Sequence, residues 1–464
     1  PDPSTDAGSS TRLVTDHQGA GVARGAWKSR VGFILAAVGS AVGLGNMWRF
    51  PYLTAENGGA AFVIVYIAMI LLLGIPIMLA EFALGRGTGQ SSISAFKRSG
   101  GKGWVPFGYL FVLTGITILA FYSVIAGWVS RYALAAVFSG FPSDPGAHFG
   151  AIASGLPAMG FHLVFMAMVI AIVMGGVEKG IERASVLMMP LLFVLIAGLA
   201  VWAATLSGGG AGYGFYLAPN LEEMLKPSTI AAAAGQAFFS LSLGMGALLT
   251  FSSYLSKDSS RPRESGTIAG ADFGVAFLAG LVLFPVIFAF GLQDVVGEST
   301  VGALFIALPE GFASLGVAGR VVGATFFFAL FIAALTSAIS LLEVVVSALI
   351  DEWQVQRKAA AIGAGIFVAL IGLWPASNTD ALGVLDVVTG NIFLPLGALG
   401  LALYVGWVYK NPIEEIATGA GTSVRRWLGG WIWLLRILAP VFLIVILAMG
   451  FGSVKDAVAA LFGG

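Results

Sequence analysis

The stretch GSAVGLGNMWRFP, Gly39 to Pro51, lies inside the first long apolar run of the chain, which begins near Val31. It holds three glycines, an asparagine and an arginine. Glycine weakens a helix, and an amide or a guanidinium at membrane depth is costly unless it faces protein or water. Two interpretations are open from these residues: a close helix–helix contact made by small side chains, or a helix interrupted for a function.

The composition indicates an integral membrane protein. Of the 464 residues, 58% are hydrophobic and only 10% are charged, and the mean hydropathy is +0.92, whereas about a quarter of the residues in soluble globular proteins are charged. The formal net charge is zero, so no overall attraction to nucleic acid is expected. The lack of cysteine excludes disulfides and iron–sulfur clusters. Residues 1–25 are polar and predict a disordered cytoplasmic tail.

Apolar runs about as long as a bilayer is thick predict about eleven transmembrane helices. The predicted spans are 31–54, 60–85, 105–138, 160–176, 184–206, 230–255, 266–291, 320–350, 359–374, 383–408 and 431–451. We therefore expect an all-α polytopic membrane protein.

Basic residues predict the orientation. Most of the 24 Lys and Arg residues precede the first span or follow an even-numbered one, whereas the opposite loops carry acids. Because short cytoplasmic loops are enriched in basic residues, we expect a plasma (inner) membrane protein with a cytoplasmic N-terminus and an extracellular or periplasmic C-terminus. Residues 411–464 would then supply a cytoplasmic loop, the eleventh helix and a short external end.

Motifs for an enzyme are missing from the sequence. It contains neither the phosphate-binding loop of P-loop NTPases nor an H-E-x-x-H zinc motif. His162, one of three histidines, is interpreted as a packing residue. A membrane enzyme is therefore the weakest interpretation, and a transporter or a channel remains.

A second apolar span is interrupted in the same way. FSLSLGMGALLTF, Phe239 to Phe251, places two serines and two glycines in apolar surroundings. Interruptions at corresponding positions of two halves indicate a transporter built from two inverted repeats of five spans, with spans 1 and 6 unwound. We expect a transporter core over 26–410, with repeats at about 26–206 and 230–410. Carbonyls freed at such breaks can bind a cation, and a half-helix N-terminus can bind a carboxylate.

The residues of these spans resemble a known family. GSAVGLGNMWRFPYLTAENGGAAF is similar to the first-span signature of the neurotransmitter:sodium symporter family. The similarity continues through FFSLSLGMG in span six and ALTSAIS in span eight, and it covers nearly the whole chain. The resemblance implies cotransport of a substrate with one or two sodium ions.

The resemblance also implies sodium ligands. One ion would be held by Asn46, Ser240, the Ala41 carbonyl and the substrate carboxylate. Where the family has asparagine at a further ligand position, this chain has Asp272. The implied ligands of the other ion are Gly39, Val42, Ala333, Thr336 and Ser337.

Gly43 bears on the substrate class. Monoamine transporters of the family resemble this chain but have aspartate at that position; glycine leaves room for a carboxylate and so implies an L-α-amino acid. The implied substrate-binding residues are Ala41, Gly43, Gly45, Ile118, Tyr122, Ile125, Phe239, Ser240, Ser242, Met245, Ser337 and Leu341. Because the flexible Met245 adapts to varied shapes, we expect a hydrophobic amino acid, with aromatic ones among the candidates.

Gates and a flexible segment are implied as well. The outer gate would be Arg49 with Asp386, and the inner gate Arg24 with Asp351, with Trp27 and Tyr254 packed nearby. Without the family, the inner pair would be interpreted as ordinary interfacial charges. In span five, GIERASVLMMP places Gly180 and Pro190 as in a family pattern that permits local unwinding.

The residues related to chloride dependence differ from those of the family. Chloride-dependent members have serine at the position of Ala276, and chloride-independent bacterial members usually have an acid there. This chain has its acid, Asp272, one helical turn earlier. We hypothesise that Asp272 supplies the compensating charge and that no chloride is needed. Glu81 and Glu343, two further acids within spans, are interpreted as hydrogen-bonded structural residues.

The sequence thus favours a sodium-coupled amino acid symporter in the lipid bilayer, with no enzymatic activity and no nucleic-acid partner. An ion channel and a transport-dead amino acid sensor on the same fold are the alternatives. The polar residues gather at the two breaks and the two gates rather than along a continuous lining, which favours the transporter. Nothing in the sequence predicts the oligomeric state.

Overall fold

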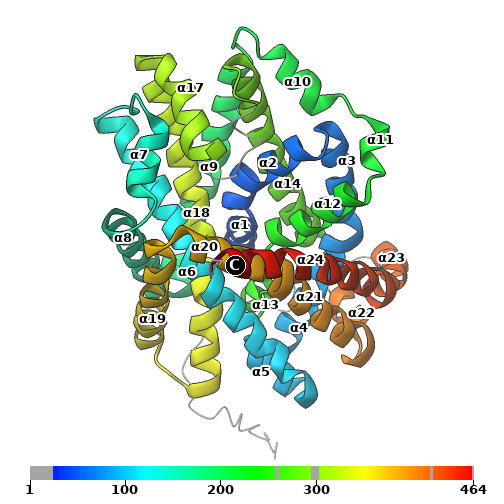
Figure 1. The fold of residues 1–464 in the computed structure, drawn as a ribbon. Coiled ribbons are helices and arrows are strands. Elements are labelled where there is room, and N and C mark those ends of the chain that lie inside the picture. The colour runs from blue at the N-terminus through cyan, green and yellow to red at the C-terminus, as the bar shows by residue number, and fades with distance from the viewer. Residues whose placement is uncertain (1–24, 256–260, 294–301, 419–421, 462–464) are drawn as a thin grey trace, which may run out of the picture.

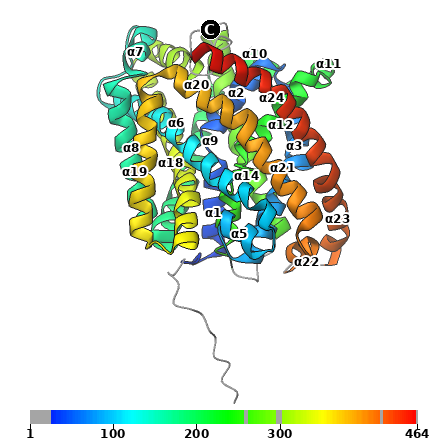
Figure 2. The same cartoon turned by 60° about the horizontal axis from the view of Figure 1, so that its bottom comes forward.

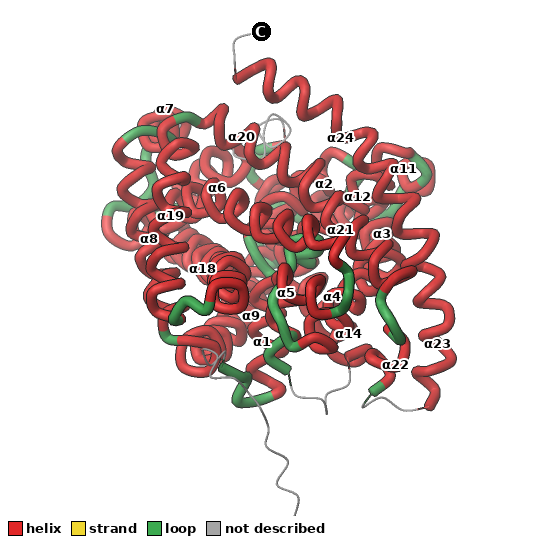
Figure 3. The backbone as a smooth tube through the Cα atoms, turned by 90° about the horizontal axis from the view of Figure 1, so that it is seen from below, coloured by secondary structure: helices red, strands yellow, loops and turns green. Residues whose placement is uncertain are grey.

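The computed structural model describes residues 25–255, 261–293, 302–418 and 422–461. Over these ranges the chain folds into helices and contains no strand (Figure 1; Figure 3). The helices pack side by side into one bundle. Helices α5 (Ser92–Arg98) and α22 (Pro412–Ala417) lie at one end, called the α5 end here. Helices α7 (Pro145–Ile152), α10 (Gly210–Leu217) and α11 (Leu221–Met224) lie at the opposite end, the α7 end (Figure 2).

Nine helical stretches of the described chain are long and apolar enough to cross a membrane. They are Ala60–Thr88, Lys102–Phe138, Leu156–Met174, Val177–Ala203, Pro262–Ala289, Val317–Trp353, Arg357–Ser377, Thr379–Val408 and Arg425–Leu461. A bent pair of helices, α1 (Arg30–Ala41) and Gly45–Glu56, forms a further span with a 48° bend. Helices α12 (Pro227–Ser240) and α13 (Ala247–Ser252) make up the interrupted sixth span. The prediction of an all-helical membrane protein with about eleven spans is confirmed.

The remaining helices, most of them parts of these spans, are as follows. They are α2 (Phe50–Glu56), α3 (Ala60–Met69), α4 (Ile75–Thr88), α6 (Val105–Phe138), α8 (Leu156–Met174), α9 (Arg183–Ala203), α14 (Arg261–Ala289), α17 (Leu308–Ser314), α18 (Val317–Trp353), α19 (Arg357–Ser377), α20 (Thr379–Val388), α21 (Leu394–Leu403), α23 (Thr422–Trp433) and α24 (Ala439–Leu461). Short π-helical segments join several of them, among them Gly45–Arg49 and Val177–Glu182. The last span reaches Leu461, ten residues past its predicted end at 451.

The helices differ in how much of their apolar surface is buried inside the protein, and this difference separates central from peripheral helices. Of the apolar part of α18, 94% is buried inside the protein, whereas only 28% is buried in α9 and in the span that ends with α24. Helix α18 packs against α6, α9 and α1 and is therefore the central wall of the bundle (Figure 1). The peripheral helices turn their apolar faces outward, as a protein dissolved in lipid requires.

The first break lies where the sequence predicts it. Helix α1 ends at Ala41, Val42 takes an extended conformation, and the helix resumes at Leu44. The Asn46 side chain stabilises the break, because its Oδ1 accepts a hydrogen bond of 3.0 Å from the Gly43 amide. The glycine stretch is therefore an interrupted helix rather than a simple helix–helix contact.

The second break is held open by a carboxylate from another span. Ser242, Gly244 and Gly246 all have positive φ angles, which end α12. Glu81 of α4 accepts hydrogen bonds from the backbone amides of Gly244 (3.0 Å) and Leu249 (2.9 Å). These contacts satisfy amide groups that the interrupted helix leaves without a partner. The structural role predicted for Glu81 is confirmed.

Candidate functional site

The two breaks face each other across a cavity at the centre of the bundle. Its lining residues come from α1, α6, α12 and α18 and from the two breaks themselves; Figure 1 shows where these helices lie in the bundle. The lining residues are Ser40, Ala41, Gly43, Leu44, Gly45, Ile118, Tyr122, Phe239, Ser240, Ser242, Met245, Ser337 and Leu341. This set holds all the predicted substrate residues except Ile125, which is fully buried in the core. Ser40 and Leu44 are additions that the sequence did not suggest.

On one side of the cavity, hydroxyl groups from other spans form hydrogen bonds with the backbone around the first break. The Tyr122 hydroxyl accepts a hydrogen bond of 3.1 Å from the Leu44 amide. The Ser242 hydroxyl donates to the Ser40 carbonyl at 2.7 Å and so ties the two breaks together. Opposite these groups the walls are apolar. The cavity therefore suits a ligand with one polar end and one apolar end.

Gly43 is the point of closest approach in this wall. A Cβ atom at Gly43 would lie 2.6 Å from the Ser337 Oγ and 2.9 Å from the Tyr122 hydroxyl. Both distances are shorter than any van der Waals contact allows. The glycine is needed here for space, since its φ is not positive.

Beside the cavity lies a fully buried carboxylate, Asp272 of α14. Its Oδ1 accepts from the Asn46 Nδ2 at 2.7 Å, and its Oδ2 accepts from the Ser240 hydroxyl at 2.8 Å and from the Tyr66 hydroxyl at 3.4 Å. All four side chains are buried. No basic nitrogen among the described residues lies within 4.0 Å of this carboxylate. A buried carboxylate without a counter-charge is costly, so the arrangement favours binding of a cation.

A second group of oxygens lies between α1 and α18. The Ser337 hydroxyl is 3.1 Å from the Val42 carbonyl and 3.3 Å from the Gly39 carbonyl. The Thr336 hydroxyl donates back to the carbonyls of its own helix, including Ala333 at 3.1 Å. The five residues predicted to hold the second ion are thus gathered at one place. They offer neutral oxygens only.

At the α7 side of the cavity, Phe239 and Arg49 form a cover. The Arg49 guanidinium carbon lies 4.7 Å from the centre of the Phe239 ring, a cation–π contact. Asp386 of α20 attracts Arg49 electrostatically, but no nitrogen–oxygen pair between the two lies within 4.0 Å. The two predicted outer-gate charges are therefore neighbours without a direct ion pair.

At the α5 end, aromatic residues close the path. The Trp27 indole nitrogen donates to the Phe251 carbonyl at 2.9 Å, and its ring lies 6.3 Å from that of Tyr254. The Asp351 carboxylate accepts from the Ser91 amide at 2.6 Å. Its predicted partner, Arg24, lies outside the described residues.

Glu343 of α18 also takes part in the contacts that close the α5 end. Its carboxylate accepts from the Tyr254 hydroxyl at 2.6 Å and from both terminal nitrogens of Arg357, at 3.0 and 2.5 Å. The hydrogen-bonded structural role predicted for Glu343 is confirmed. The ion pair with Arg357 connects the centre of the bundle to α19.

Glu182, which the sequence analysis missed, holds the start of the first span. Its carboxylate accepts from the backbone amides of Lys28 (2.7 Å) and Ser29 (3.1 Å) and from the Ser29 hydroxyl (2.7 Å). It lies two residues after Gly180, at the end of the π-helical segment Val177–Glu182. The only signal in the sequence was an acid in the polar linker between spans four and five.

We expect Glu182→Ala to open the α5 end. Three hydrogen bonds to a charged group would be lost, which is enough to shift a closed–open equilibrium by about tenfold or more. The chain has no cysteine, so a single Ser253→Cys in the cavity beside Trp27 reports on this end alone. We expect the introduced cysteine to react faster with a polar thiol reagent when Glu182→Ala is also present than when Glu182 is kept.

The control for this experiment is Glu178→Ala. Glu178 is an exposed acid of the same π-helical segment, and its side chain makes no hydrogen bond or ion pair with any residue that the structure describes. It should leave the labelling rate unchanged. Equal rates in the two variants would show that Glu182 does not hold this end closed.

Known proteins resemble this chain over nearly its full length. Residues 24–149 and 147–459 match the model of the sodium:neurotransmitter symporter family. An uncharacterised sodium-dependent transporter of Bacillus subtilis (strain 168), YhdH, is 34% identical over 90% of this chain and 96% of its own length. The sodium-dependent nutrient amino acid transporter 1 of Drosophila yakuba is 25% identical over 97% of this chain and 81% of its own length. The crystal structure of MhsT in complex with L-phenylalanine superposes with a TM-score of 0.84 at 40% identity, covering 92% of this chain and 100% of MhsT.

Proposed function

This chain belongs to the sodium:neurotransmitter symporter family, and on that premise we propose that it is a sodium-coupled symporter of a hydrophobic L-α-amino acid. The observation that carries the proposal is the buried Asp272 carboxylate, which lies beside the cavity at the first break and has no basic partner among the described residues. Sodium bound there supplies the missing positive charge, and the same ion would also attract the substrate carboxylate at the first break. Binding of ion and substrate is thereby coupled, because each neutralises charge near the other.

The first sodium ion is assigned to Ala41, Asn46, Ser240 and Asp272. Asp272 lies at hydrogen-bonding distance from the side chains of Asn46 and Ser240, which supports this set because the three side chains are already gathered at one place. The second ion is assigned to Gly39, Val42, Ala333, Thr336 and Ser337, whose neutral oxygens suit a monovalent cation.

The substrate is assigned from the shape and chemistry of the cavity. The α-carboxylate would lie at the first break, near the Tyr122 hydroxyl and the space that Gly43 leaves. The side chain would lie against Ile118, Met245 and Leu341, which are apolar. The bound L-phenylalanine of MhsT supports an aromatic amino acid as a candidate.

Alternating access would proceed around this fixed site. Phe239 and Arg49, with Asp386, would open toward the α7 end to admit sodium and substrate. Trp27, Tyr254 and the Arg24–Asp351 pair would open toward the α5 end to release them. Unwinding between Gly180 and Pro190 would give water a path to the second ion: Met189, beside Pro190, has its sulfur 3.3 Å from the position of a Cβ on Gly39.

The topology follows from the basic residues of the loops. We assign the α5 end to the cytoplasm and the α7 end to the outside of the plasma (inner) membrane. The transporter core is assigned to 26–410, with inverted repeats at about 26–206 and 230–410. Residues 411–464 add the eleventh helix.

Uptake by proteoliposomes tests the function. Labelled leucine, methionine, phenylalanine, tyrosine and tryptophan are offered under an inward sodium or potassium gradient. We expect accumulation of at least one of them with sodium only. Binding without accumulation would favour the sensor, sodium currents without substrate would favour a channel, and no response to any α-amino acid would refute the substrate assignment.

A further inference from the structure

A groove on the outside of the bundle lies apart from the transport cavity. It has a volume of about 260 Å³ and is formed by α6, α8 and α18 near the α7 end. Leu134, Val164 and Phe328 line it and are 50%, 58% and 44% exposed. The single hydroxyl in the lining, that of Ser130, is used up by its hydrogen bond to the Ala126 carbonyl (2.7 Å). The groove is therefore wholly apolar and open to the surrounding lipid.

The positively charged side chain of Arg131 lies next to this groove. The guanidinium carbon of Arg131 lies 5.6 Å from the centre of the Phe161 ring, and Phe161 lines the groove. Among the described residues no carboxylate lies within 4.0 Å of Arg131, and no hydrogen bond involves its side chain. An arginine at a membrane span is expected to have an anionic or polar partner, and the described residues supply none, which leaves Arg131 free to bind an anion from outside the chain.

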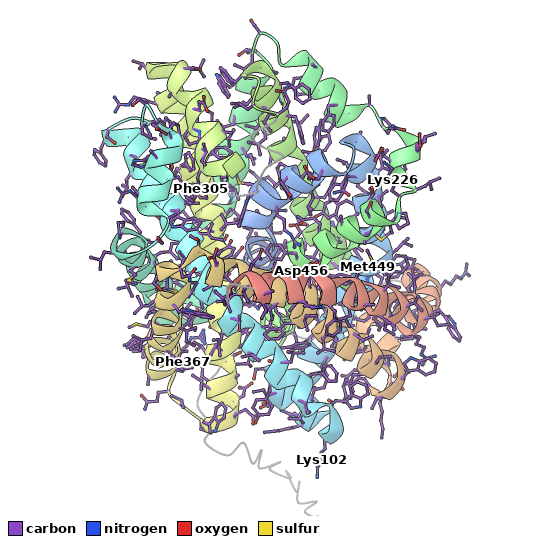
Figure 4. All side chains as sticks on the ribbon, viewed as in Figure 1. Lys102, Lys226, Phe305, Phe367, Met449 and Asp456 are labelled. Carbon is purple, nitrogen blue, oxygen red and sulfur yellow. The ribbon has the colours of Figure 1, made fainter. Side chains whose placement is uncertain are left out.

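The position of Arg131 along α6 indicates what kind of partner it has. Arg131 lies 26 residues after Val105, about 39 Å along the tilted helix α6 at 1.5 Å per residue, and so near the α7 end of that helix (Figure 2). The next residue, Tyr132, packs edge-on against His148 of α7, with ring centres 5.8 Å apart. It also packs against Phe305, which Figure 4 labels at the same end of the bundle. Arg131 therefore lies near the α7 end of the bundle, where the headgroups of one lipid leaflet are expected.

We propose that this groove binds one anionic phospholipid, whose phosphate accepts hydrogen bonds from Arg131 and whose acyl chain lies along Ala133, Val164 and Phe328. Guanidinium and phosphate form strong, charge-assisted hydrogen bonds, frequently in pairs. An anionic lipid is favoured over a zwitterionic one because it brings no ammonium group to offset the attraction. A lipid is favoured over a second copy of the chain because a protein interface needs about 800 Å² on each side, far more than one narrow groove supplies.

Native mass spectrometry of the full chain in detergent tests the proposal. The protein is titrated with dioleoylphosphatidylglycerol or with dioleoylphosphatidylcholine, and the dissociation constant of the first bound lipid is measured. We expect phosphatidylglycerol to bind more tightly, and Arg131→Gln to weaken it by about tenfold or more. Arg131→Lys keeps the charge and should retain most of the affinity. Ala133→Trp fills the groove and should weaken both lipids.

The control is Lys455→Gln, which removes an exposed positive charge from α24 on another face of the bundle. It should not change lipid binding, and melting temperatures in the same detergent should show that all variants are folded. Equal binding of the two lipids, or unchanged binding in Arg131→Gln and Ala133→Trp, would overturn the proposal. A loss of dimer rather than of lipid in Ala133→Trp would assign the groove to a second copy instead.

Discussion

Replacing Gly43 by alanine is expected to lower sodium-dependent uptake by about 10- to 100-fold while leaving the protein folded. A methyl group at this position would lie 2.6 Å from the Ser337 Oγ and 2.9 Å from the Tyr122 hydroxyl. Overpacking of this kind costs about 1–3 kcal/mol, and here the strain falls on the groups assigned to the substrate carboxylate and the second sodium ion. Ser337 and Tyr122 must move apart, which takes both out of the geometry that binding needs.

The measurement compares uptake and equilibrium binding of the preferred amino acid in Gly43→Ala and Gly198→Ala. Gly198 lies in α9, and a Cβ there would meet nothing within 4 Å. The same chemical change is thus made where there is space, and this control should transport normally. If Gly43→Ala binds and transports like the control, the wall at Gly43 is not part of the substrate site.

The position of this site could be predicted because local sequence determines where a helix breaks. The glycines between Gly39 and Gly45, and those at Gly244 and Gly246, weaken helices at places where polar side chains also occur. The family resemblance then related the two breaks to each other. The structure agrees, since the two breaks line one cavity and are joined by the hydrogen bond from Ser242 to the Ser40 carbonyl.

The limits of the cavity could not be predicted in the same way. Ile118, Tyr122 and Ile125 share one face of a helix by their spacing, and sequence periodicity does not say how far along that face the cavity extends. Ile118 and Tyr122 line the cavity, whereas Ile125, one turn further on, does not. Ser40 borders the cavity because α1 ends one residue later, a detail of backbone geometry that periodicity does not determine.

Contacts between distant segments could not be predicted from the sequence where the family resemblance did not imply them. Glu182 lies more than 150 residues from the amides of Lys28 and Ser29 that it accepts from, and nothing local to either segment suggests the pairing. The Glu81 carboxylate likewise reaches an interrupted helix 163 residues away. Hydrogen bonding could be expected for these buried acids, but their partners are set only by the packing of the spans.

Replacing Asp272 by asparagine is expected to weaken the apparent sodium affinity by about 10²- to 10³-fold, because removing one partner of a buried charge pair costs about 3–5 kcal/mol. The change keeps the size of the side chain, and its amide oxygen can still accept from the Asn46 Nδ2. The effect would therefore come from the lost charge rather than from a collapsed site. The concentration dependence of uptake on sodium measures it.

The same variant tests the hypothesis that Asp272 replaces chloride. The parent protein should transport equally in chloride and in gluconate, because its compensating charge is built in. Ala276 lies one turn after Asp272 on α14, and both are fully buried. Adding Ala276→Ser to Asp272→Asn supplies a hydroxyl where chloride-dependent relatives have serine, close in sequence to the position that has lost its charge.

We expect this double variant to recover uptake in chloride but not in gluconate. Ala276→Ser alone is the control, since it adds the hydroxyl while keeping the Asp272 charge, and it should remain independent of chloride. A chloride requirement in the parent protein would refute the hypothesis directly. If Asp272→Asn instead keeps the sodium affinity of the parent, Asp272 does not contact the ion, and the negative charge at this break serves another purpose, such as proton exchange during return of the empty carrier.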